Sequence, residues 1–100
     1  MYPLLEKEIE YKVVKYCKAH GIYTRKFVSP GHSGVPDRIF AHAGRVLFLE
    51  FKRPGQKPTG LQAKELKLLR DAGVMVTWVT SYEDALYEIY TYLEKPCQAI

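Results

Sequence analysis

The first stretch of the chain alternates apolar and polar residues with the period of an amphipathic helix. The apolar positions of this stripe are Leu5, Ile9, Val13, Tyr16 and Cys17. Pro3 stands near the beginning, where a helix tolerates proline, and Gly21 supplies a C-terminal stop. The pattern therefore predicts a helix from Leu4 to His20 with one buried face.

Two later stretches show the same helical period. Thr59-x-x-Gln62 is a capping-box pattern, which predicts the start of a helix that ends at Gly73. The predicted buried stripe of this helix comprises Leu61, Leu66, Leu69 and Ala72. Ser81 is the predicted cap of a last helix, which Pro96 stops. The predicted buried stripe of the last helix comprises Tyr82, Ala85, Leu86, Ile89 and Leu93.

The stretches between these helices are rich in β-branched and aromatic residues, which is typical of strands. The predicted strands are Ile22 to Val28, a short one at Ile39-Phe40, Val46 to Lys52 and Val74 to Thr80. A turn at Ala43-Gly44 can pair the second strand with the third, and the helix after the third makes a parallel, right-handed β-α-β unit. The resulting order α, β, β, β, α, β, α predicts an α/β fold with a mixed central sheet flanked by helices.

Charged residues stand at positions of these strands that a purely structural core would not favour. Side chains alternate faces along a strand, so Glu50 and Lys52 project from the same face. Asp37 follows Pro36, and pairing across the turn would bring Asp37 towards Glu50. Two carboxylates beside a lysine are a candidate magnesium site, because Mg²⁺ takes carboxylate oxygens and keeps several waters. The alternative is an ion pair at a strand end and an aspartate that caps a turn.

Two motifs in this region resemble a known nuclease signature. Pro36-Asp37 followed by Glu50-Phe51-Lys52 is similar to the PD-(D/E)XK motif. Within that superfamily, the run Gly34-Val35-Pro36-Asp37-Arg38 with a later Gln62 resembles the virus-type replication-repair nuclease (VRR-NUC) domain, in the small standalone form found in phage proteins. The likeness extends from about Glu6 to Thr80. It implies a restriction-endonuclease-like αβββαβ core, followed here by a C-terminal helix, and the periodicity gives the same order independently.

The resemblance implies a metal-dependent endonuclease that hydrolyses DNA phosphodiester bonds. Asp37 and Glu50 would hold Mg²⁺ or Mn²⁺, with the Phe51 carbonyl as a further ligand. Lys52 would position or activate the attacking water. A different class of function, a nucleic-acid binding module that keeps the fold without cleaving, is the alternative.

The family also places a glutamate of the N-terminal helix and a glutamine of the later helix at the active site. Glu6-x-x-Ile9 fits the glutamate pattern, and Glu10 on the same helix is an alternative to Glu6. Gln62 fits the glutamine, although its position in the capping box is a sufficient structural reason for it. A solvated position is the alternative for either glutamate.

Positive charge surrounds the candidate site. Residues 21 to 60 carry seven Lys and Arg against two acids, whereas residues 74 to 100 carry one against four, within a net charge of +4. This distribution favours a phosphate-backbone ligand, and hence DNA as a partner. The candidate DNA-binding residues are Arg25, Lys26, His32, Ser33, Arg38, Arg53 and Lys57. The alternatives are a solvated His32 and an ordinary surface loop from Arg53 to Gly60.

Several function classes find no support in the sequence. Cys17 and Cys97 lie far apart and match no zinc spacing, so a reducing, cytoplasmic setting is expected, including that of a phage-infected or lysogenic bacterium. No apolar run approaches the ~18 residues of a membrane span, and neither export nor a membrane partner is expected. A glycine-rich phosphate loop of Walker or Rossmann type is also absent from the sequence, which argues against a nucleotide-binding protein.

The length predicts one domain over residues 1–100. Small standalone members of the resembled family imply a symmetric homodimer that acts on branched DNA, such as four-way (Holliday) junctions. Tyr87, Tyr90 and Tyr92 lie outside the stripe of the last helix and are candidates for burial against a partner, the alternative being exposed aromatics on a monomer. Trp78 and Tyr82 are interpreted as structural residues.

Overall fold

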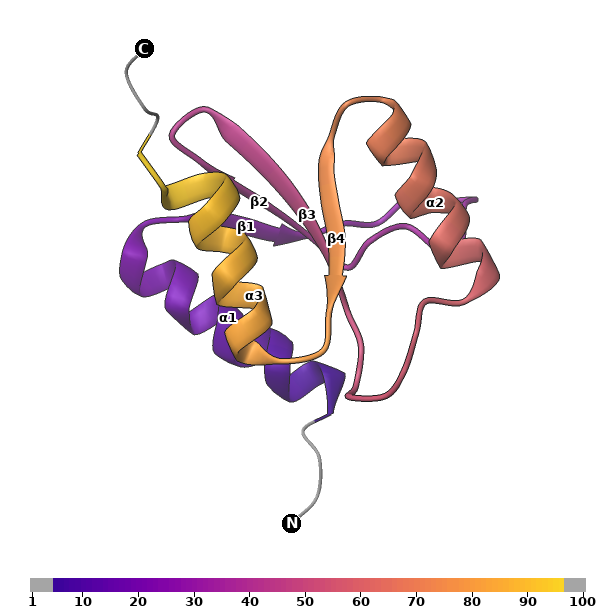
Figure 1. The fold of residues 1–100 in the computed structure, drawn as a ribbon, viewed down its shortest axis with the longest axis horizontal. Helices are drawn as coiled ribbons and strands as arrows, with labels where there is room; N and C mark the ends of the chain where they lie inside the picture. The colour runs from indigo at the N-terminus through magenta and orange to yellow at the C-terminus, as the bar shows by residue number, and fades with distance from the viewer. Residues whose placement is uncertain (1–4, 97–100) are drawn as a thin grey trace.

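The structure is a computed structural model, and it describes residues 5–96 of the chain. The elements in chain order are α1 (Glu6–His20), β1 (Tyr23–Lys26), β2 (Arg38–His42), β3 (Arg45–Phe51), α2 (Gly60–Asp71), β4 (Met75–Val79), α3 (Tyr82–Ile89) and a π-helical turn, η1 (Tyr90–Glu94). The predicted α/β class and the αβββαβ order with a C-terminal helix are therefore confirmed (Figure 1).

The described strands form one four-stranded sheet with the order β1-β2-β3-β4. The first two pairings are antiparallel and the pairing of β3 with β4 is parallel, as a mixed sheet requires. Ala43 and Gly44, which join β2 to β3, have positive φ angles of 53° and 78°. Positive φ at both turn residues suits the right-handed twist of the two flanking strands, so this short turn fixes their register.

Helices cover both faces of the sheet and divide the core into two parts. In Figure 1, α1 and α3 lie together on one face and α2 lies on the other. The main core fills the first side, between the sheet, α1, α3 and η1. The smaller core fills the second side and is built on Phe48, Leu66 and Val76. Alternate residues of β3 serve the two cores, because side chains of a strand alternate faces.

The ends of α1 differ slightly from the sequence prediction. The helix begins at Glu6, and Leu5 is its N-cap residue with 49% of its surface exposed, so Leu5 is not part of the buried stripe. Gly21 adopts the left-handed conformation, φ 69°, and its N–H donates to the Cys17 carbonyl. Gly21 thus ends the helix as predicted, because glycine takes this conformation without steric cost.

The buried stripe of α2 is shorter than predicted. Leu66 is buried and Leu69 packs partly against the smaller core, but Leu61 and Ala72 are exposed. The helix packs on the sheet through its middle turns, so residues of its first turn and its C-cap extend past the contact. Arg70, in the last turn of the helix, is exposed and donates from Nε to the Val76 carbonyl at 3.2 Å.

Two predicted strands end earlier than expected. β1 ends at Lys26, although the Phe27 N–H still donates to the Asp37 carbonyl at 2.9 Å, and Val28 is 72% exposed. β3 ends at Phe51, and the Lys52 N–H donates to the Val79 carbonyl at 2.9 Å. The backbone of Lys52 thus remains tied to the sheet one residue beyond the strand.

The last helix departs from the prediction at its C-terminal part. A regular helix is seen only to Ile89, and the following turn is π-helical, while Leu93 remains fully buried as predicted. Tyr87 and Tyr90 are 67% and 53% exposed, but Tyr92 packs against the main core. The wider π-helical turn rotates later residues relative to a regular helix, which explains why Tyr92 is not on the outer face. Within residues 5–96, no helix is long and apolar enough to cross a membrane.

Candidate functional site

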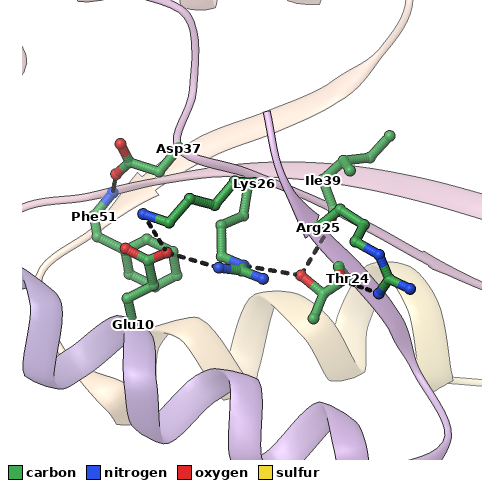
Figure 2. Close-up of polar contacts among 8 residues, drawn as sticks. Glu10, Thr24, Arg25, Lys26, Asp37, Ile39 and Phe51 are labelled. Atoms are coloured by element: carbon green, nitrogen blue, oxygen red, sulfur yellow. Dashed lines mark hydrogen bonds and ion pairs between the residues drawn. The ribbon is translucent and has the colours of Figure 1, made fainter. Parts of the chain in front are cut away.

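The pairing of β2 with β3 positions Asp37 beside the end of β3. Arg38 pairs with Leu49, and the preceding residue continues the ladder, because the Asp37 N–H donates to the Leu49 carbonyl at 3.1 Å. The carboxylate then reaches the next amide along, where the Phe51 N–H donates to Asp37 Oδ2 at 2.7 Å (Figure 2). Two hydrogen bonds thus fix the backbone and the side chain of Asp37, and Oδ1 is left as its candidate metal ligand.

Glu50 is a buried carboxylate, with only 2% of its surface exposed. It lies on the same face of β3 as Phe48, at the end of the smaller core. Gln62 Nε2 donates to Glu50 Oε2 at 2.7 Å, and Lys52 Nζ lies 3.6 Å from the same oxygen. Among the described residues, none donates a hydrogen bond to the buried Oε1 atom. A buried acceptor without a donor is costly, so this oxygen is suited to a cation.

The pKa values of Asp37 and Glu50 are both raised, and burial is the largest cause for each. The pKa of Glu50 is raised to about 7, first by burial and then by the negative charge of Asp37, while Lys52 opposes the shift. Burial also raises the pKa of Asp37, and the hydrogen bond from the Phe51 amide opposes it. For both carboxylates, burial makes the ionised form less favourable than it is in water, as is common in sites that bind a cation or a substrate.

Gln62 combines the capping box with a contact to the candidate site. Its Oε1 accepts from the Thr59 N–H at 2.9 Å, and its backbone N–H donates to Thr59 Oγ1 at 3.3 Å, which completes the capping box. The same amide group donates from Nε2 to Glu50. The start of α2 is thus connected through one side chain to the carboxylate on β3.

Gly34 brings the loop before Asp37 against the same helix start. Its φ is +89°, and a Cβ atom there would lie 2.8 Å from the Leu61 carbonyl carbon and oxygen and 3.0 Å from the Gln62 nitrogen. Only glycine allows this approach, because the missing side chain leaves room for the backbone of α2. The Gly-Val-Pro-Asp run therefore positions Gln62 as well as Asp37.

The two candidate glutamates of α1 have different environments. Glu10 Oε2 is 2.9 Å from Arg38 Nη1 and 3.6 Å from Lys26 Nζ, so two cations already neutralise it (Figure 2). Glu6 instead faces the loop after Lys52, where the Gln56 amide, in the orientation that satisfies both of its groups, donates to Glu6 Oε1 at 2.7 Å.

Both glutamates affect the pKa values of the site. The charges of Glu10 and Glu6 each raise the pKa of Asp37, after the larger effect of burial, whereas Glu6 also raises the pKa of Glu50. Glu6 therefore lies within electrostatic reach of both carboxylates. Among residues 5–96 it is connected to a cation only through Gln56, whose carbonyl accepts from Arg53. Of the two residues, Glu6 is the better candidate to serve the site.

The candidate DNA-binding residues fall into two groups. His32, Ser33, Arg53 and Lys57 are exposed, on the two loops that flank Asp37 and Lys52. Lys26 has 73% of its side chain exposed, at the end of β1. Arg25 lies over the Tyr23 ring at 4.6 Å, and it also donates to the Thr24 carbonyl.

Arg38 differs from the other cations, because it is directed into the protein. Only 12% of its side chain is exposed, and its guanidinium donates to Glu10 and to Thr24 Oγ1, the latter at 3.1 Å. The Thr24 hydroxyl in turn donates to the Ile39 carbonyl at 2.9 Å (Figure 2). No local sequence pattern indicates these contacts, because the residues that make them come from α1, β1 and β2.

The donor set fits a hard divalent cation. Within residues 5–96, no group of three or more His, Cys, Asp or Glu side chains is arranged to hold a metal ion. Mg²⁺ does not need such a group, because it is usually bound through one or two carboxylates and keeps several of its waters. Asp37 and Glu50 supply those carboxylates, and the undonated Glu50 Oε1 is a ligand oxygen that the protein itself does not use.

Comparisons with known proteins place the chain among its relatives. No protein-family model matches the chain. A protein of Acyrthosiphon pisum secondary endosymbiont phage 1, named "Putative nuclease p44", is 46% identical over 61 residues, which are 60% of this chain and 66% of that protein. The chain thus spans just under two thirds of that relative's length.

Two solved structures share the fold. One, named "VRR_NUC domain protein", has a TM-score of 0.80 at 19% identity, over 93% of this chain and 91% of its own, and it shows the fold alone. The other, named "VRR_NUC domain", has a TM-score of 0.76 at 30% identity and covers 85% of this chain and 96% of its own. The fold and the phage relative support a nuclease assignment, and the chain belongs to the VRR-NUC domain family.

Proposed function

We propose that this protein is a metal-dependent endonuclease that hydrolyses phosphodiester bonds in DNA. The observation that carries the proposal is the state of Glu50, which is buried, raised in pKa to about 7 and undonated at Oε1, beside both Asp37 and Lys52. Such an arrangement costs stability, and a bound cation would remove that cost. Family membership and the phage relative support the same function.

In this proposal each residue has a separate role. Asp37 and Glu50 hold Mg²⁺ or Mn²⁺, with the Phe51 carbonyl as a further ligand. The metal, when bound, lowers the pKa of a coordinated water and offsets negative charge on the phosphate. Lys52 Nζ, 3.6 Å from Glu50, positions the attacking water or a phosphate oxygen. Its low exposure keeps the ammonium from moving freely into solvent.

Two further residues assist the carboxylates. Gln62 orients Glu50 through the hydrogen bond to Oε2, so that Oε1 is the oxygen presented to the cation. Glu6, at the first turn of α1, would assist through its negative charge, which acts on both Asp37 and Glu50. Glu10 is held by Arg38 and Lys26 and is assigned to structure.

The DNA backbone would lie along the exposed cations next to the carboxylates. The proposed contacts are Arg25, Lys26, His32, Ser33, Arg53 and Lys57. Arg38 is left out of this set, because its guanidinium is taken up by Glu10 and Thr24. The phage origin of the relative supports a setting inside a bacterial cell.

The proposal is tested with Lys52→Ala and Glu50→Ala, each assayed on labelled DNA with Mg²⁺, Mn²⁺ or EDTA. We expect both variants to lose at least about 100-fold in cleavage rate, since groups that act on transition-state charge have effects of this size. Lys67→Ala and Glu83→Ala are matched controls on exposed helix positions and should cut like the parent. Folded Lys52→Ala and Glu50→Ala proteins with parental activity would contradict the assignment.

The same assay separates the endonuclease from a binding module that shares the fold. A binding module would retain DNA in a salt-sensitive manner, with no cleavage and no requirement for a divalent metal. Cleavage that EDTA abolishes and Mg²⁺ or Mn²⁺ restores would support the endonuclease.

We further propose that the protein acts as a symmetric dimer on branched DNA such as four-way junctions. Tyr87 and Tyr90 expose aromatic rings on α3 and η1, on the face of these helices that is turned away from the core. A two-fold dimer would bring two sites to one junction and allow paired cuts. Sedimentation at micromolar concentration tests the dimer, and cleavage of a junction against the matching linear duplex tests the substrate. A monomeric mass together with equal cutting of both DNAs would contradict this part alone.

A further inference from the structure

A cavity lies at the end of β4, the strand that pairs with the strand carrying Glu50. It has a volume of about 350 Å³, and its walls are the loop after Lys52, the end of β4 and the first turn of α3. The lining side chains that matter for its chemistry are Gln56, Lys57, Trp78, Thr80 and Asp84. None of these residues except Lys57 had been assigned to DNA.

The cavity is joined to the candidate site through the sheet. In the parallel pairing of β3 with β4, the partner of Glu50 is Trp78. Neighbouring strands lie about 5 Å apart, so the backbone that carries the Trp78 indole lies directly beside the backbone that carries the buried carboxylate. Val79, another wall residue, accepts a hydrogen bond from the Lys52 N–H at 2.9 Å. A nucleic acid with its phosphate at Asp37 and Glu50 would therefore have its neighbouring groups at this cavity.

Trp78 is more than a core residue in this position. The side chain packs against the smaller core, which contains Phe48 and Val76, and the residue is nevertheless only partly buried and lines the cavity. A partly exposed aromatic ring in a cavity wall can serve as a stacking platform, because every nucleobase has a π-face that can lie on it. The rigid strand holds that platform in place.

The polar groups of the cavity suit the edge of a base and not a phosphate. Asp84 places a carboxylate in the wall, which would repel a phosphate but can accept from the amino group of adenine, cytosine or guanine. The Thr80 hydroxyl and the Gln56 amide can each donate or accept. Lys57, on the outer loop, is the wall residue that would meet the adjoining backbone.

We propose that this cavity receives an unpaired nucleobase next to the scissile phosphate, stacked on Trp78. The inference rests on the proposed function, since it takes DNA as the ligand of the neighbouring site. A base that is unpaired in advance, as at a branch point or in a single strand, enters without the cost of leaving a duplex. The cavity thus favours DNA that has an unstacked base next to the cleaved bond.

The experiment uses the intrinsic fluorescence of the protein, because Trp78 is the only tryptophan in the sequence. The cleaved bond is first mapped on a labelled forked DNA with Mg²⁺ or Mn²⁺. The parent is then titrated in EDTA with that DNA and with copies that carry an abasic nucleotide on either side of the mapped bond or at a remote position. We expect the intact and the remote-abasic DNA to quench Trp78, and one flanking abasic DNA to lose the quenching and bind about tenfold more weakly.

Variants of Trp78 supply the second measurement. Trp78→Leu should bind the intact DNA about tenfold more weakly than the parent and should no longer distinguish it from the flanking-abasic DNA. Trp78→Phe, which retains a ring, should keep most of that distinction. Thermal melting reports the folding of each variant, and the abasic series on the unaltered protein does not depend on it. Equal quenching and equal affinity for all of the DNAs would overturn the inference.

The outcomes separate this inference from the proposed function. Metal-dependent cleavage without any effect of a flanking abasic nucleotide would support the proposed nuclease function and contradict the base-binding role of the cavity. If no DNA is cut under any metal, abasic nucleotides are instead scanned along the fork, and position-dependent quenching would support the base cavity while removing the nuclease. An absence of DNA binding would remove both.

Discussion

At the scale of single residues, the main feature is the cost of the buried Glu50 carboxylate. Its pKa of about 7 means that, between the ordinary pKa of a glutamate and about pH 7, the protein without metal holds a proton on this group that the unfolded chain has released. A Lys52 ammonium at 3.6 Å and a Gln62 amide at 2.7 Å stabilise one oxygen and leave the other without a donor. The buried carboxylate thus destabilises the protein without metal, and a bound divalent cation would restore that stability.

The first prediction concerns the pH dependence of metal binding. Because the folded pKa of Glu50 is raised to about 7, the proton competes with the metal below that pH and leaves the site above it. Mn²⁺ should therefore bind about tenfold more tightly at pH 8 than at pH 6, with release of a proton. Calorimetry in buffers of different ionisation enthalpy measures both quantities. An affinity that is the same at both pH values would contradict the role of Glu50.

The second prediction concerns Gly34, whose missing side chain allows close contact with α2. Gly34→Ala should destabilise the protein by about 2 kcal/mol, through positive φ and through the clash with the Leu61 backbone, and should lower cleavage by moving Gln62. Gly31→Ala is the matched control, because Gly31 has a similar φ of +82° but no atom within 4 Å of the added Cβ. It should cost about 1 kcal/mol and leave the cleavage rate unchanged. Urea denaturation and initial rates measure the two effects, and equal behaviour of both variants would contradict the contact.

At the scale of elements, α1 is fixed to the sheet by a polar contact as well as by its apolar face. Glu10 and Arg38 form an ion pair with 15% and 12% of their side chains exposed, and Arg38 immediately follows Asp37 in the chain. The pair therefore joins the helix to the start of the strand that carries the candidate ligand. A buried pair of this kind depends on both partners, since removal of one leaves the other charge uncompensated.

The third prediction is the stability cost of separating this pair. Glu10→Gln should destabilise the protein by about 3 kcal/mol, because Arg38 would keep its charge in a site with little water. The Lys67–Asp71 pair on α2 is the control, with side chains 75% and 61% exposed, and Asp71→Asn should cost less than about 0.5 kcal/mol. Urea denaturation of both variants makes the comparison. Similar losses for the two would show that Glu10 has no special role in holding α1.

The elements also show what could be predicted from the sequence. Alternation along one strand places Glu50 and Lys52 on one face, and the Ala43-Gly44 turn pairs β2 with β3, so local rules suffice for the central contacts. The ion pair of Glu10 with Arg38 joins residues 28 positions apart, and no local rule relates them. Arg38 was accordingly expected at the DNA surface, because only the packing of α1 on the sheet determines its direction.

At the scale of the whole molecule, two cores share one sheet, and the candidate site lies at the end of the smaller one. The molecule is flat, with principal extents of 39, 37 and 23 Å. Helices cover both faces of the sheet (Figure 1), and the loops that carry His32 and Arg53 adjoin Asp37 and Lys52 in the chain. The excess of basic residues lies in the same part of the chain, so the candidate site and the positive charge occur in one region.

The fourth prediction concerns the salt dependence of DNA binding. Each phosphate contact releases condensed counterions, so the slope of log affinity against log salt measures the number of contacts. Arg53 and Lys57 are exposed on the loop next to Lys52, and Arg53→Gln with Lys57→Gln should weaken binding and reduce the magnitude of that slope by about 2. Lys18→Gln with Lys67→Gln removes the same charge from exposed positions on α1 and α2 outside the two loops. This control should change the slope by less than half as much, because net charge alone makes no phosphate contact. Binding measured in EDTA over a series of salt concentrations gives both slopes, and equal slopes for the two double variants would mean that the loop after Lys52 does not contact the DNA backbone.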